Sequence, residues 1–226
     1  MRLWIRIISF VFQSTFQMSQ NQEYMRDIAE IRSMMERSTK FLSLSGWAGI
    51  LAGIYALAGA YIAYAAFGFD PAAWGETPGT AGGQGPKIAN LVVLGLTVLL
   101  LAVSTAIILS ARNANRKGEK VWNATSRRLL VSMAVPLVTG GVLILIFLSK
   151  DMIGWLAPLS LIFYGLALHS AGNFTFTDVK QLGLIQIALG LLGAAFIEWS
   201  LWFWALGFGI VHIVYGIYIH RKYERQ

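Results

Sequence analysis

The chain contains no cysteine and carries little charge. None of its 226 residues is Cys, and only 13% are Asp, Glu, Lys or Arg, against roughly 25% in soluble domains. The lack of cysteine excludes disulfides, thiol catalysis and cysteine-ligated zinc or iron–sulfur sites. The low charge, with 56% apolar residues and a mean hydropathy of +0.60, indicates a surface that faces hydrocarbon and not water.

Six long apolar runs account for this composition. They lie near residues 44–67, 88–111, 129–149, 152–170, 180–198 and 202–219. Each is close to the ~20 residues that a helix needs to cross a bilayer core of about 30 Å. The predicted fold class is therefore all-α, a polytopic bundle of six transmembrane helices formed by residues 41–220, with a basic tail at 221–226.

Lys and Arg fall on alternate gaps between these runs. Of the 18 such residues, all but Lys87 and Lys150 lie on the N-terminal arm, on the gaps after the second and fourth runs, or on the tail. The positive-inside rule then predicts that both termini are cytoplasmic. We interpret the net charge of +7 as an attraction to the bilayer and its anionic headgroups, and not as a nucleic-acid interface.

The N-terminal arm, residues 1–40, differs from the rest of the chain. Tyr24, Ile28, Ile31 and Met35 recur at helical spacing and predict a short cytoplasmic amphipathic helix over residues 22–40. It lies against the bundle or the membrane, or it docks a partner. Residues 1–17 form an interfacial helix, or else translation starts at Met18; both readings stay open.

A few polar side chains fall inside the runs. His212 lies in the middle of the sixth, and an ionisable group at that depth is a candidate functional residue. Gln186 falls at a similar depth in the fifth run, so we expect a His212–Gln186 hydrogen bond. Tyr55, Tyr164 and Tyr215 could also reach the centre. A structural hydrogen bond and a functional site are about equally supported, and no ligand set or nucleophile–base pair predicts a metal, a cofactor or catalytic residues.

Prolines and glycines give expectations for helix shape and packing. Pro136 in the third run and Pro158 in the fourth are expected to kink their helices. Gly49 and Gly53, four residues apart in the first run, would allow another backbone to approach closely. That second helix belongs to the same chain or to a second copy, and the sequence leaves both open.

Two segments carry a resemblance to known proteins. They read IRSMMERSTKFLSLSGWAGILAGIYALAGA, from Ile31 to Ala60, and GFGIVHIVYGIYIHRKYER, from Gly207 to Arg225. Together they resemble bacterial inner-membrane proteins of the Bacteroidetes type, whose function is unknown. The resemblance implies a multi-pass protein of the inner membrane, and it implies no catalytic or binding residues.

Three classes of function remain at this stage. The first is a non-enzymatic scaffold or regulatory subunit acting through the basic cytoplasmic face, with a membrane partner or a second copy. The alternative is a transporter or channel for a small molecule or ion, with a path near the kinked third and fourth helices and His212. An intramembrane enzyme has the least support.

Overall fold

A computed structural model of the chain describes residues 45–71, 88–116, 118 and 122–224. The amphipathic helix predicted for residues 22–40 lies outside these residues, as does the choice between Met1 and Met18. The chain divides into two units, Met1–Lys40 and Phe41–Gln226. All that follows concerns the second unit.

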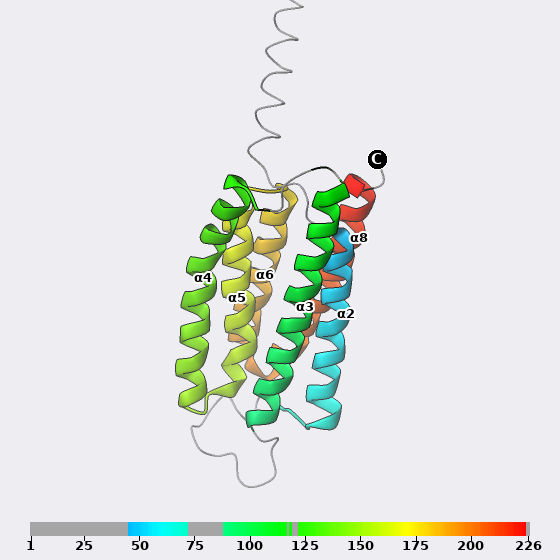
Figure 1. Cartoon of the computed structure of the whole chain (residues 1–226). Helices are drawn as coiled ribbons and strands as arrows, with labels where there is room; N and C mark the ends of the chain where they lie inside the picture. The colour runs from blue at the N-terminus through cyan, green and yellow to red at the C-terminus, as the bar shows by residue number, and fades with distance from the viewer. Residues whose placement is uncertain (1–44, 72–87, 117, 119–121, 225–226) are drawn as a thin grey trace, which may run out of the picture. The chain divides into compact units, whose positions relative to one another are not determined.

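The described residues form helices and no strand (Figure 1). The α-helices are α2 (Gly46–Tyr61), α3 (Ile88–Arg116), α4 (Ala124–Ser149), α5 (Leu156–Ala171), α6 (Asp178–Ala195), α7 (Ser200–Trp204) and α8 (His212–Ile219). Three π-helical segments extend or join them: η1 (Ile62–Ala66), η5 (Ala205–Val211) and η6 (His220–Glu224). Two 3₁₀ turns, η3 (Ile153–Trp155) and η4 (Ile197–Trp199), precede α5 and α7.

Six of these helical stretches are long and apolar enough to cross a membrane. Within the part of the chain that the structure describes, they are Gly46–Ala66, Ile88–Arg116, Ala124–Ser149, Ile153–Ala171, Asp178–Ala195 and Ile197–Tyr223. The prediction of six helical spans is confirmed, with ends that differ from the expected ones by up to five residues. The protein is a multi-pass helical membrane protein.

The surface of the bundle is apolar because its surroundings are. No residue in the most apolar stretch of α3 is buried, and Leu100 on that helix is 67% exposed. Val131 on α4 is 69% exposed. Such a surface would drive aggregation in water, whereas in a bilayer it contacts lipid tails of equal polarity.

The core is formed where two pairs of helices touch through glycine. In the α5–α6 hairpin, a Cβ built on Gly165 would lie 2.6 Å from the carbonyl oxygen of Gly183, and the reverse distance is also 2.6 Å. The first and last spans meet in the same way, because a Cβ on Gly216 would lie 2.6 Å from the carbonyl oxygen of Gly46. α2 and α8 therefore lie side by side (Figure 1).

Gly49 and Gly53 belong to this second contact. A Cβ on Gly49 would lie 3.2 Å from the Cα of Gly216, and one on Gly53 would lie 2.6 Å from the carbonyl oxygen of Gly209. The helix that approaches them is thus the last span of the same chain. α3 packs on the neighbouring face of α2, and α4 packs on α5.

The two prolines lie at different positions in their helices. Pro136 lies inside α4, which continues without interruption from Ala124 to Ser149. Pro158 is the third residue of α5, where a helix has no intrahelical partner for the backbone N–H that proline lacks. The kink expected at Pro158 therefore has no cause in the backbone of α5.

The close contact between α2 and η5 can be tested by adding one methyl group. Gly53→Ala would place a Cβ against the carbonyl oxygen of Gly209 and Cγ1 of Ile213, each at 2.6 Å. We expect the free energy of unfolding to fall by about 1–3 kcal/mol, the usual cost of overpacking. Gly95→Ala is the matched control, because a Cβ there has open space around it. Denaturant titration of both variants in micelles measures the difference, and equal stabilities would contradict the contact.

Candidate functional site

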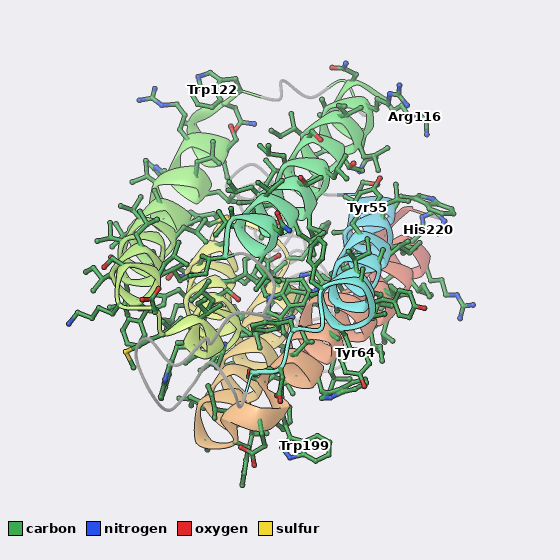
Figure 2. The ribbon with its side chains drawn as sticks, turned by 90° about the horizontal axis from the view of Figure 1, so that it is seen from below. Tyr55, Tyr64, Arg116, Trp122, Trp199 and His220 are labelled. Atoms are coloured by element: carbon green, nitrogen blue, oxygen red, sulfur yellow. The ribbon has the colours of Figure 1, made fainter. Side chains whose placement is uncertain are left out.

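The polar groups of the membrane interior come from three helices. Tyr164 lies on α5, Gln186 on α6, and His212 is the first residue of α8, directly after the π segment η5. Gln186 is 0% exposed and His212 is 5% exposed. Figure 2 shows the side chains of the bundle along its axis. The structure brings these three predicted residues into one connected group.

His212 uses both ring nitrogens. Its Nδ1 lies 2.8 Å from the backbone carbonyl oxygen of Gly207. A carbonyl can only accept, so we assign the proton of the neutral ring to Nδ1. The unprotonated Nε2 then accepts a hydrogen bond from the Tyr164 hydroxyl, 3.1 Å away. Both ring nitrogens are satisfied in the neutral form.

Gln186 binds the same carbonyl. Its Nε2 donates to the carbonyl oxygen of Gly207 at 2.8 Å. The expected partner of Gln186, His212 Nδ1, is also close, at 3.2 Å. Since both nitrogens carry protons in our assignment, the two side chains meet as donors to one shared acceptor. The Gly207 carbonyl is therefore the centre of the group.

The π segment explains why this carbonyl accepts two side chains. A π-helical turn is wider than an α-helical one and loosens the pairing of its own carbonyls, and such segments are frequent at functional sites. A Cβ at Gly207 would lie 2.6 Å from Gln186 Oε1 and 2.7 Å from Leu161 Cδ2, so a larger residue there would displace both side chains. The absence of a side chain lets the amide of Gln186 lie against the backbone of η5.

An aromatic column borders the group. Trp204, Phe208 and His212 recur every four residues on the last span, with ring centroids 5.1 and 5.7 Å apart. The ring of Tyr164 lies against it, 5.0 Å from Phe208. At one end, Trp204 Nε1 donates to Ser160 Oγ at 3.1 Å. The four-residue aromatic spacing was a signal that could have identified this column from the sequence.

Two buried oxygens near this group have no hydrogen-bond partner among the described residues. They are Gln186 Oε1 and the Tyr215 hydroxyl. Tyr55, the remaining predicted residue, lies elsewhere: its hydroxyl pairs with Thr105 Oγ1 at 3.4 Å, between α2 and α3. The structure thus separates Tyr55 from the other four predicted residues.

A second polar cluster lies at the end of the bundle where α6 begins. Asp178 accepts hydrogen bonds from Tyr223 at 2.9 Å and from Tyr218 at 3.3 Å, and it forms a salt bridge with Lys222 at 3.0 Å. Phe176 stacks on Tyr223 with centroids 4.1 Å apart. This cluster joins α6 to η6. Sequence analysis missed it, because the partners of Asp178 lie 40 to 45 positions away from it.

The comparisons with known proteins are brief. No family model, curated protein or solved structure matches the chain. Within the described ranges, no group of three or more His, Cys, Asp or Glu side chains could hold a metal ion. The group around His212 is hydrogen-bonded and links three helices.

The hydrogen bond between Tyr164 and His212 can be measured by a double-mutant cycle. Tyr164→Phe and His212→Leu each remove one partner, while Gly207 retains Gln186 as a donor. We expect a coupling energy of about 0.6 kcal/mol, and at most about 1.7 kcal/mol, as for other hydrogen bonds in bilayers. Unfolding titrations in mixed micelles provide the four values.

Tyr55→Phe combined with His212→Leu is the control cycle. The two residues share no partner, so their effects should add within about 0.5 kcal/mol. A coupling of zero in the Tyr164 cycle, or an equal coupling in both cycles, would show that the hydrogen bond contributes nothing specific.

Proposed function

We propose that the chain is a non-enzymatic scaffold or regulatory subunit of the bacterial inner membrane, which acts through its cationic end. The observation that carries the proposal is the distribution of charge along the bundle. We call "the basic end" the end that carries the exposed residues Arg112, Arg116, Arg127, Arg128 and Arg221. The η6 segment, the end of α3 and the beginning of α4 all lie there (Figure 1).

The opposite end has the reverse balance. Among the residues that the structure describes, it carries Lys150 together with Asp70, Asp151 and Glu198. Short loops rich in Lys and Arg stay on the cytoplasmic side during insertion. The asymmetry therefore supports an orientation with the basic end, and both termini, in the cytoplasm. The resemblance of the terminal segments to bacterial inner-membrane proteins supports the same location.

The arginines that flank the α3–α4 connection are available for a partner. Within the described part of the chain, Arg127 and Arg128 make no ion pair, whereas Lys222 is held by Asp178. Trp122, beside them in the sequence, is 67% exposed. Exposed arginine with an interfacial tryptophan suits anionic headgroups and the acidic surface of a membrane-bound partner.

The polar groups inside the membrane support the non-enzymatic part of the proposal. His212, Tyr164 and the Gln186 amide nitrogen are engaged in neutral bonds to one another and to Gly207. In the described spans, no carboxylate belongs to this group. An intramembrane hydrolase would need an activated nucleophile beside a base.

A specific feature favours the alternative of a small-molecule or ion transporter. Gln186 Oε1 and the Tyr215 hydroxyl are buried without a hydrogen-bond partner among the described residues, near a π-helical segment of the last span. Irregular backbone and free polar atoms at membrane depth are typical of binding sites in carriers. The path would pass His212, as expected from the sequence, but Pro158 supplies no kink beside it.

The orientation can be tested by thiol labelling, since the chain has no cysteine. Ser149 is exposed at one end of the bundle and Asn173 at the basic end. In intact spheroplasts, a membrane-impermeant maleimide should label Ser149→Cys at once. It should label Asn173→Cys only after the membrane is permeabilised. The reverse pattern would overturn the orientation.

The scaffold function can be tested by photo-crosslinking in the native membrane. A photoreactive residue at Arg127 should give one discrete protein adduct, and Arg128→Gln should reduce its yield several-fold. Salt at 1 M should also reduce it, because the Debye length is then only about 3 Å. The same probe at Val138, 64% exposed in the middle of α4, should react with lipid.

Two results would contradict this function. One is that the probe at Arg127 gives only lipid adducts. The other is that purified protein in liposomes carries out a saturable flux that His212→Leu abolishes, which would favour the transporter.

A further inference from the structure

Three tyrosines connect the membrane centre with the basic end. Tyr164, Tyr215 and Tyr223 all pack against one buried cluster, formed by Leu168, Phe176, Val179, Leu182 and Ile219. Tyr215 and Tyr223 follow His212 by three and eleven positions on the last span, which places them on the same helical face. The face is directed towards α5, which carries Tyr164 and Leu168, and towards α6, which carries Val179 and Leu182.

Hydrogen bonds define both ends of this series. At the basic end, the Tyr223 hydroxyl donates to Asp178 at 2.9 Å. In the interior, the Tyr164 hydroxyl donates to His212 Nε2 at 3.1 Å. Tyr215 lies between His212 and Tyr223 along the last span, and it packs against the same buried cluster as Tyr164 and Tyr223.

The hydrogen bonds along the three tyrosines are interrupted at the Tyr215 hydroxyl. The oxygen is fully enclosed, yet no described residue hydrogen-bonds to it. A buried hydroxyl without any partner costs about 1–3 kcal/mol, so buried polar atoms of this kind are usually satisfied by water. Such a water makes about three hydrogen bonds to nearby polar groups.

We propose that the Tyr215 hydroxyl binds a water molecule that bridges the Asp178–Tyr223 pair to Tyr164, so that His212 is connected to the basic end by a continuous series of hydrogen bonds. Tyr215, Tyr223 and Tyr164 each supply an oxygen that both donates and accepts, as the bridge requires. The ligand is water, and the site is formed by α5, α6 and the last span.

The bridge would give His212 a route for protons from the basic end. A proton arriving from the water would bind the Tyr164 oxygen while the Tyr164 proton moves to His212 Nε2, and the reverse step restores the neutral ring. The titratable groups around this route are Tyr164 on α5, Asp178 on α6, and Tyr215, Tyr218, Lys222 and Tyr223 on the last span. This inference goes beyond the scaffold function and does not depend on it.

Tyr215→Phe tests the water site by the sign of its effect. If the hydroxyl binds a bridging water, removing it should lower the midpoint of thermal unfolding by several degrees. If the hydroxyl is unpaired in the folded protein, the same change removes a buried unsatisfied group and should raise the midpoint. Tyr55→Phe is the matched control, since it deletes a tyrosine hydroxyl whose partner is Thr105. A midpoint that is unchanged or raised overturns the proposal.

Water contact is measured independently by water-edited solid-state NMR. The protein is labelled with ¹⁵N-histidine and reconstituted in liposomes, and His212→Gln identifies the signal of His212 among those of the three histidines. The ring of His212 should receive magnetisation from water, and Tyr215→Phe should slow this transfer several-fold, whereas Tyr55→Phe should leave it unchanged. A His212 signal that stays as dry as the methyl groups of the lipid-facing helices overturns the proposal, whatever the stability of the variant.

Discussion

The bundle depends on the direct contact of backbones at glycine. Lipid tails are as apolar as leucine, so transmembrane helices gain little by hiding apolar surface from them. What distinguishes one helix pair from another is how closely the two backbones can pack. The contacts of Gly165 with Gly183 and of Gly46 with Gly216 are of this kind, and they fix the register of α5 against α6 and of α2 against α8.

This register is what brings the polar group together. Tyr164 lies one residue before Gly165, Gln186 three residues after Gly183, and His212 four residues before Gly216. The α5–α6 contact thus places Tyr164 and Gln186, the α2–α8 contact lies one turn from His212, and the close approach of Gln186 and Leu161 to Gly207 joins the two sets. Packing and hydrogen bonding in this protein are two results of one arrangement of small residues.

Much of the fold could be predicted from the sequence, because the length of an apolar run determines whether a helix spans a bilayer. The depth of His212, Gln186 and Tyr164 could be predicted in the same way. The rotation of each helix about its own axis could not be predicted. For this reason the sequence did not reveal that Tyr55 lies at the α2–α3 contact, apart from the other predicted residues. The position of Pro158 near the start of α5 could not be predicted, because the first residue of a helix is not visible in a continuous apolar run.

Other features depend on long-range geometry. The acceptor at the centre of the group is a backbone carbonyl, which every residue has, so nothing in the sequence distinguishes Gly207. The salt bridge between Asp178 and Lys222 connects the far ends of two consecutive spans, 44 positions apart, and their pairing depends on how these spans pack.

The length of α3 has a consequence for how the protein responds to its membrane. Its 29 residues extend about 43 Å, whereas a typical hydrocarbon core is about 30 Å thick. Because α3 packs mainly on α2 and its most apolar stretch is not enclosed, a change in bilayer thickness can be met by tilting this one helix. As it tilts, Arg112 and Arg116 move relative to the phosphates, so the lipid composition of the membrane sets the height at which these charges are presented.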